Sequence, residues 1–182
     1  MSKKLRFDLG VDDKYLKAIG QVAIQWACFE CAFDLLILVL DSVDKRGSTG
    51  YITVEYLKSV KDLEILESSP FKKRKTLLKK LANKHILKKD FLTILFEKID
   101  RSQKLRDHRD IIIHGAWGEK ATGGVVIASQ KMYRKIDARK YFYSLKKIED
   151  IAWEISELNL WFESNFFLEP KALRPLYTTL GH

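Results

Sequence analysis

The strongest constraint on the fold is a long run of apolar residues near the start of the chain. Between residues 16 and 40 apolar side chains return every three or four positions, which is the period of a helix with one buried face. Asp12 or Asp13 is placed to cap this helix, and the pattern continues to about Asp44. The run therefore predicts the central helix of a helical protein.

Within this run, Val22 to Leu40 is the one segment that could pass for a membrane span. Gln25, Glu30 and Asp34 interrupt it, and each charge at mid-bilayer costs on the order of 3 kcal/mol. The first eight residues are basic, but no apolar stretch follows them, so they do not resemble a secretory signal. We expect a core helix in a cytoplasmic protein that has no membrane partner.

Further helices are expected along the rest of the chain, and they define the fold class. Ser69 and Pro70 are placed as the cap and first position of a helix that runs past Leu81, and Ser144 is placed to cap the last one. Other helical patterns cover 54–67 and 90–114, and strand and turn residues over 117–136 predict a hairpin. The sequence therefore predicts an all-α bundle with a small β-hairpin before the last helix.

The length bounds the domain organisation. With 182 residues, 46% of them hydrophobic, the chain is long enough for one domain with a core that needs no disulfide. We expect a single domain over 1–182, with its core at about 12–167 and a loosely held tail at 169–182.

Positive charge is concentrated in one stretch. Residues 70–106 contain thirteen Lys or Arg and three Asp or Glu, so this stretch carries +10 while the whole chain carries +9. Such a stretch attracts polyanions, which makes nucleic acid the leading partner and an anionic lipid surface the second. The alternative is a solvated helix exterior. The residues we assign to RNA binding are Lys72, Lys73, Arg74, Lys75 and Arg106.

Common cofactor and metal signatures are missing. The chain has no glycine-rich nucleotide loop and no His-Glu-x-x-His motif. Cys28 and Cys31 form a Cys-x-x-Cys pair, but they lie within the most apolar helix and have no second pair, so we expect them to pack in the core. We expect neither a metal nor a cofactor.

The best candidate site is the stretch from Arg106 to Trp117, where two arginines and two histidines gather near a helix end. An imidazole titrates near neutral pH, so it can accept a proton from a ribose 2′-hydroxyl or donate one to a leaving oxygen. A nearby arginine can hold the scissile phosphate and offset the charge of the transition state. These two groups suffice for RNA cleavage without a metal.

Arg109, Asp110, three apolar residues and His114 match the motif of HEPN domains (higher eukaryotes and prokaryotes nucleotide-binding), in which four to six residues separate an arginine from a histidine. The layout over about residues 12–167 also resembles bacterial HEPN proteins. It has a long first helix, a basic amphipathic helix near 72–81, the motif at the end of a long helix, and a final helix that opens at Tyr143-Ser144-Leu145.

The resemblance implies an all-α homodimer in which the motifs of both chains line a cleft and cut single-stranded RNA without metal. Arg109 would bind phosphate, His114 would act as acid and base, and Asp110 would orient its neighbours. Many relatives are toxins or phage-defence ribonucleases. Relatives silenced by a partner nucleotidyltransferase tend to carry a tyrosine two residues after the histidine, where this chain has Ala116, so that pairing is doubtful here.

Helix geometry raises a question about the pair. Five residues of a straight helix turn through about 500°, which leaves Arg109 and His114 roughly 140° apart on its surface. Either the helix loosens before Gly115, or the working pair comes from two chains across a two-fold axis, which we favour. The alternatives are a His114 that interacts with the helix dipole and an Arg109 that pairs with a neighbouring aspartate.

Two further residues are expected to support the site. His108 is a second titrating group next to Arg109, and we leave its role open. Glu30 shares a helix face with Asp34, and buried acids need partners, for which we expect Arg106 or Arg109.

Two other functions compete with the nuclease. One is a non-catalytic HEPN-like module that binds RNA or nucleotides, and the other is an interaction protein whose basic face docks on an acidic partner such as an antitoxin.

Overall fold

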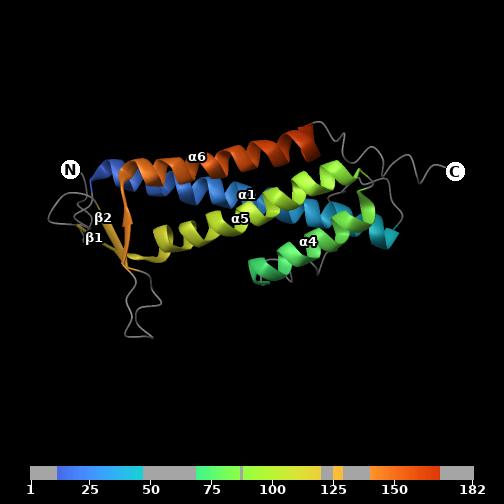
Figure 1. Ribbon diagram of the computed structural model, residues 1–182, viewed down its shortest axis with the longest axis horizontal. Coiled ribbons are helices and arrows are strands. Elements are labelled where there is room, and N and C mark those ends of the chain that lie inside the picture. Colours follow the sequence, from blue (N-terminus) through green and yellow to red (C-terminus); the bar gives the residue numbers. More distant parts are fainter. Residues whose placement is uncertain (1–11, 47–68, 87, 120–124, 129–139, 169–182) are drawn as a thin grey trace, which may run out of the picture. The chain divides into compact units, whose positions relative to one another are not determined.

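The computed structural model describes residues 12–46, 69–86, 88–119, 125–128 and 140–168. Helices dominate these residues, so the expected all-α class is confirmed (Figure 1). The expected helix at 54–67, the turn residues 122–124 and the tail at 169–182 lie outside them. In chain order the elements are α1 (Asp13–Arg46), α4 (Phe71–His85), α5 (Lys89–His114), β1 (Ala116–Glu119), β2 (Val125–Ala128), β3 (Lys140–Tyr143), α6 (Leu145–Phe162) and the π-helical turn η2 (Glu163–Leu168).

Three helix ends follow the signals in the sequence. The Asp12 Oδ1 atom accepts a hydrogen bond from the Lys14 amide at 3.0 Å, so Asp12 caps α1. Ser144 Oγ accepts one from the Lys147 amide at 3.2 Å, so Ser144 caps α6. The Gly115 amide donates to the Ile111 carbonyl at 3.0 Å, which closes the last turn of α5.

The start of α4 differs from the expectation by one residue. The helix begins at Phe71, its cap position is Pro70, and no side chain caps it. The Pro70 carbonyl accepts hydrogen bonds from the Lys73 and Arg74 amides at 2.8 and 3.3 Å. Ser69 therefore does not act as the cap.

The chain divides into two compact units, which we describe separately. Unit 1 comprises Met1–Ala27 and Lys104–Ser156, and unit 2 comprises Cys28–Gln103 and Glu157–His182.

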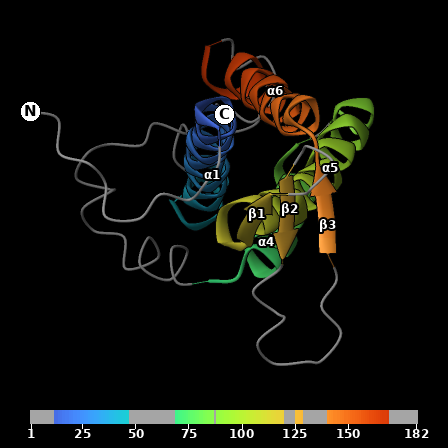
Figure 2. The same cartoon turned by 90° about the vertical axis from the view of Figure 1, so that its left-hand side faces the viewer.

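Unit 1 packs the first turns of α1 against the end of α5 and the start of α6. Its buried side chains include Val22, Trp26, Leu105, Ile112 and Ile148. The strands form an antiparallel sheet in the order β1-β2-β3 (Figure 2). The β1–β2 pair is the expected hairpin, and β3 is a strand that the sequence did not predict.

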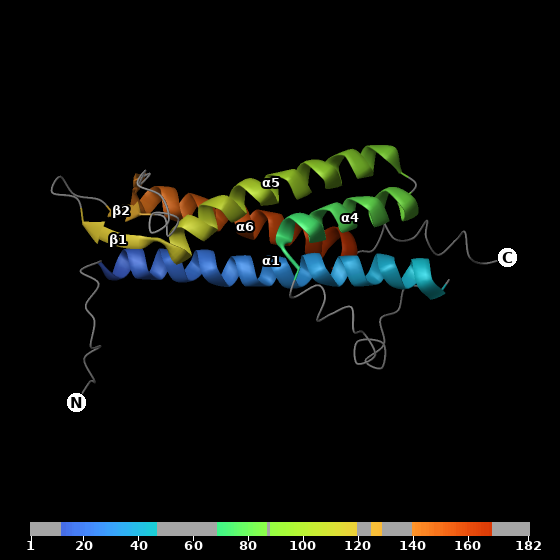
Figure 3. The same ribbon diagram turned by 90° about the horizontal axis from the view of Figure 1, so that it is seen from below.

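Unit 2 has an aromatic core. Phe29 and Phe33 of α1, Phe71 of α4 and Phe162 of α6 are all buried, and the ring centroids of Phe29 and Phe33 lie 5.2 to 6.4 Å from each other and from those of Phe71 and Phe162. Figure 3 shows α4 running beside α5, and the Lys79 ammonium of α4 binds the Asp100 carboxylate of α5 at 2.8 Å. Aromatic burial of this kind contributes more to stability than the surface ion pair does.

Helix α1 is the one helix within the described residues that is long and apolar enough to cross a membrane. Core helices of soluble proteins can have the same length and composition, so this property is weak evidence that α1 crosses a membrane. The helix buries Val22 and Trp26 in unit 1 and Phe29, Phe33 and Leu36 in unit 2.

The two cysteines do not pack in the core. Cys28 and Cys31 are both exposed, so the expected burial is wrong. The buried side of α1 follows Phe29, Phe33 and Leu36, and the cysteines fall outside that stripe. An apolar helix with few charges does not reveal from its sequence which of its apolar sides is covered.

Candidate active site

The motif residues lie at the last turns of α5 in unit 1. Arg109 and Asp110 precede the end of the helix by one turn, and His114 is its final residue. The Trp117 indole Nε1–H donates to the Ile112 carbonyl at 3.0 Å, which ties the start of β1 to this helix end. The backbone that carries the motif is therefore held on both sides of Gly115.

One guanidinium nitrogen contacts both other motif residues. Arg109 Nη1 lies 2.9 Å from Asp110 Oδ1 and 3.3 Å from His114 Nε2. The Arg109 side chain is 25% exposed and His114 is exposed. The structure therefore brings the three predicted catalytic residues together, within reach of solvent, inside a single chain.

This contact changes the expectation drawn from helix geometry. The helix continues to His114, yet the two side chains meet. The angular separation describes where side chains leave the helix, whereas the arginine side chain is long enough to curve around the final turn. A second chain is therefore not needed to place Arg109 beside His114.

The contact also defines the hydrogen-bonding roles. An arginine N–H can only donate, so His114 Nε2 accepts with its lone pair. Within the described residues, the hydrogen bonds of the Arg109 guanidinium to Asp110 and His114 are both made by Nη1, and Arg109 Nε is buried without a hydrogen-bond partner there. The site thus places an imidazole nitrogen and a guanidinium group side by side at an exposed helix end.

Asp110 lies between two arginines. Its Oδ1 accepts from Arg109, and its Oδ2 lies 3.6 Å from Arg106 Nε. The ion pair considered as the alternative role of Arg109 is therefore present, and it coexists with the histidine contact. A carboxylate in this position forms a charge-assisted hydrogen bond that limits the rotamers of Arg109.

His108 has a partner that the sequence did not reveal. Its Nδ1 lies 2.7 Å from the Tyr143 hydroxyl, and the two rings meet edge to face with centroids 6.0 Å apart. Tyr143 ends β3 and is buried. This contact connects β3 to the last turns of α5. In the sequence, the only sign of a role for Tyr143 is its position just before the Ser144 cap.

Burial raises the pKa of Tyr143 to about 12, with a smaller contribution from Tyr141. Folded Tyr143 holds its proton more tightly than an unfolded tyrosine, so its contribution to stability is complete below pH 10 and disappears as the pH approaches 12. Between these pH values the free energy of unfolding of the wild type should fall by on the order of 1–2 kcal/mol more than that of Tyr143→Phe. Urea unfolding at pH 9 and 11.5 measures this, with Tyr15→Phe as the control. An equal loss in both variants would contradict the assignment.

The acids of α1 pair with a residue of α4. Arg74 Nη2 binds Glu30 Oε1 and Arg74 Nη1 binds Asp34 Oδ2, each at 2.5 Å. The expected partners, Arg106 and Arg109, are therefore wrong, and Glu30 is a structural residue of unit 2. The Arg74 side chain is only 9% exposed, so its expected role in RNA binding is also wrong.

The other predicted RNA-binding residues of α4 differ in exposure. Lys72 and Lys73 are exposed. The Lys75 side chain is 22% exposed and its Nζ lies 3.5 Å from Asp100 Oδ1. Lys72 and Lys73 are therefore the members of this group that are most available to a phosphate.

Within the described ranges, no three His, Cys, Asp or Glu side chains gather as metal ligands. No protein-family model, curated protein or solved structure matches the chain. The described residues define an all-α protein with a small sheet, and its candidate site is the arginine, aspartate and histidine at the end of α5.

Proposed function

We propose that this protein is a metal-independent endoribonuclease of the HEPN type that cuts single-stranded RNA. The observation that carries the proposal is the 3.3 Å contact between Arg109 Nη1 and His114 Nε2 at an exposed helix end. A phosphate-binding cation beside a proton acceptor is the minimum that cleavage by the ribose 2′-hydroxyl requires.

In the proposed reaction, Arg109 moves its donors from His114 to the scissile phosphate, with Asp110 holding the guanidinium in place. His114 Nε2 takes the proton of the 2′-hydroxyl, and the 2′-oxygen forms a bond to phosphorus. The bond from phosphorus to the 5′-oxygen breaks, and that oxygen takes a proton from a second imidazole. The products are a 2′,3′-cyclic phosphate and a 5′-hydroxyl.

The second imidazole is proposed to come from another copy of the chain. One His114 cannot hold a proton to donate while it accepts one in the same step. A two-fold axis would place two copies of the motif in one cleft, and a homodimer is the simplest assembly with that symmetry. Lys72 and Lys73 of unit 2 are proposed as separate phosphate contacts, which add salt-dependent affinity.

The biological setting follows from the HEPN resemblance. We propose a cytoplasmic toxin or phage-defence effector that an antitoxin protein can restrain. The position of the motif at the end of α5, the basic α4 and the final helix after Tyr143 support the comparison with HEPN proteins.

The direct test is cleavage of RNA in the presence of EDTA. The purified protein should cut a labelled single-stranded RNA at an unchanged rate in 5 mM EDTA, a concentration on the order of that used to remove divalent ions. Each 5′ fragment should end in a 2′,3′-cyclic phosphate, which mass spectrometry identifies. The same RNA with 2′-deoxy substitutions should resist cleavage, because the attacking hydroxyl is absent.

Three outcomes would count against the proposal. Fragments that end in a 3′-hydroxyl would require a different nucleophile. Cleavage that stops in EDTA would assign the reaction to a metal. Binding without turnover would favour the non-catalytic RNA-binding module.

A further inference from the structure

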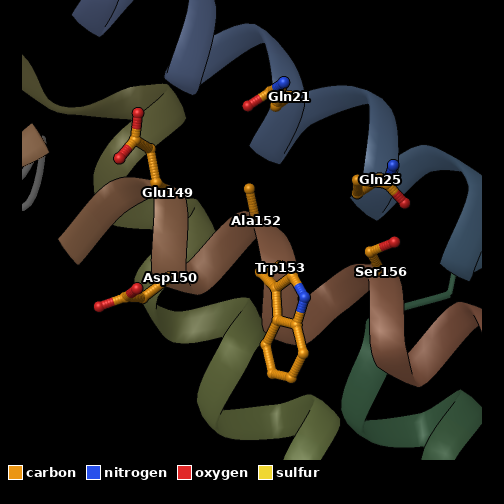
Figure 4. A pocket seen from close by; sticks show the side chains of 7 residues that line it. All are labelled: Gln21, Gln25, Glu149, Asp150, Ala152, Trp153 and Ser156. Atoms are coloured by element: carbon orange, nitrogen blue, oxygen red, sulfur yellow. The ribbon is translucent and has the colours of Figure 1, made fainter. Parts of the chain in front are cut away.

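A hollow in unit 1 includes none of the residues proposed to cleave RNA. It measures about 490 Å³, within the range of roughly 300–1,000 Å³ that is common for small-ligand sites. Figure 4 shows its lining from close by. The lining residues are Gln21 and Gln25 of α1 and Glu149, Asp150, Ala152, Trp153 and Ser156 of α6.

The charge of the lining is negative. It contains Glu149 and Asp150 and no basic side chain. Glu149 is exposed and forms no ion pair with another residue in the described ranges. Asp150 accepts a hydrogen bond from Lys146 at 3.0 Å, but the Lys146 side chain is 83% exposed, so water screens this pair strongly. The hollow therefore disfavours phosphate and favours a cation.

An indole ring borders the hollow with much of its surface in water. Trp153 is 64% exposed. In contrast, Trp26 is buried, Trp117 donates to a carbonyl and Trp161 stacks on Phe91. The face of an indole attracts a cation, and guanidinium groups stack on it particularly well.

Neutral hydrogen-bond acceptors complete the lining. Gln21 and Gln25 are one helical turn apart on α1, and Figure 4 shows both on the side of α1 that faces Ala152 and Ser156 of α6. Each glutamine has a carbonyl oxygen and Ser156 has a hydroxyl, and all three can accept hydrogen bonds. Ala152 contributes only a methyl group, which keeps the floor of the hollow free of a large side chain.

We propose that this hollow binds an arginine side chain of a basic peptide segment from a partner protein. The guanidinium stacks on Trp153 and donates to the Glu149 carboxylate and to the Gln21 side-chain oxygen. A planar guanidinium with five N–H donors matches acceptors that border an indole ring better than the compact ammonium of lysine does. This inference is independent of the proposed nuclease activity.

The test uses nuclear magnetic resonance of the full chain labelled with ¹⁵N. The probe is the peptide acetyl-Gly-Gly-Arg-Gly-Gly-amide, and its matched control carries citrulline, which has the same shape without the charge. The Trp153 indole signal, assigned with Trp153→Phe, should shift until it saturates with the arginine peptide. The signals of Trp26, Trp117 and Trp161 should stay in place, and citrulline should leave all four unchanged.

Variants identify the contacts. In Trp153→Ala the indole signal is lost, so binding is measured there from the side-chain amide signals of Gln21 and Gln25. Trp153→Ala should weaken the peptide about tenfold, and Glu149→Gln about threefold. Glu97→Gln, which removes an exposed acid of α5 that does not line the hollow, should leave the affinity unchanged.

Three results would overturn the proposal. The first is an equal shift with the citrulline peptide, because charge would then not be recognised. The second is an equal affinity in Trp153→Ala and the wild type. The third is a loss of single-stranded RNA binding in Trp153→Ala with no peptide binding by the wild type, which would assign the hollow to a stacked base.

Discussion

Replacing His114 with alanine should lower the rate of RNA cleavage by about 10²- to 10⁴-fold, the usual contribution of a general acid or base. The imidazole is the group proposed to remove the 2′-hydroxyl proton. Among the described residues, only Asp110 also lies within hydrogen-bond distance of Arg109 Nη1, so no second imidazole of the same chain is there to replace His114. His114→Gln should be as inactive, because an amide forms hydrogen bonds but does not exchange protons near neutral pH. Single-turnover cleavage in EDTA measures both variants.

The control for this experiment separates chemistry from stability and charge. His114 is exposed at the helix end, so its variants should keep the unfolding midpoint of the wild type. Arg109→Ala should lose activity, whereas Arg101→Ala, which removes an exposed arginine of the same helix, should retain it. Full activity of His114→Ala would refute the assignment of the base.

Mixing two inactive variants tests whether Arg109 of one copy can work with a single His114 of the other. A dimer of one His114→Ala chain and one Arg109→Ala chain has no chain with both groups intact. This dimer keeps only one His114 and so lacks the second imidazole of the proposed reaction, and the mixture should therefore stay inactive. Recovery of activity would show that Arg109 of one copy works with His114 of the other.

The helix ends near the site could be predicted because local chemistry determines them. Asp12, Ser144 and Gly115 act at the termini where their residue types suggested. Capping depends on atoms within a few residues of one another, so a single sequence contains the needed information. The placement of the motif at the end of a helix is the part of the site that followed from this.

Side-chain partners could not be predicted in the same way. The spacing of Glu30 and Asp34 places them on one helix face, but tertiary packing decides which helix covers this face, and it is α4 rather than α5. Residue spacing shows which side chains share a face and not what packs against it.

The Arg109–His114 contact was missed for a different reason. The angle between two residues around the helix axis gives only the directions in which their side chains leave the helix. An arginine side chain is long and flexible, so its guanidinium can lie far from that direction. The His108–Tyr143 contact could not be foreseen because β3 has only four residues. A strand that short gives a weak periodic signal.

Replacing Arg74 with alanine should destabilise the protein by about 3 kcal/mol, near the lower end of the cost of breaking a buried ion pair. The change leaves two carboxylates, with side chains 30% and 17% exposed, close together without their shared cation. It also removes the guanidinium that lies 5.5 Å from the centre of the Phe71 ring in the core of unit 2. Urea unfolding at pH 7 measures the loss.

The neighbouring Lys73 provides a matched control. Lys73 lies on the same helix and is exposed, so Lys73→Ala should change stability by less than about 0.5 kcal/mol. A triple variant with Arg74→Met, Glu30→Gln and Asp34→Asn should be more stable than Arg74→Ala, because it leaves no charge at this cluster. If Arg74→Ala were as stable as Lys73→Ala but bound RNA more weakly, Arg74 would return to the RNA-binding surface, and the ion pairs with α1 would have no structural role.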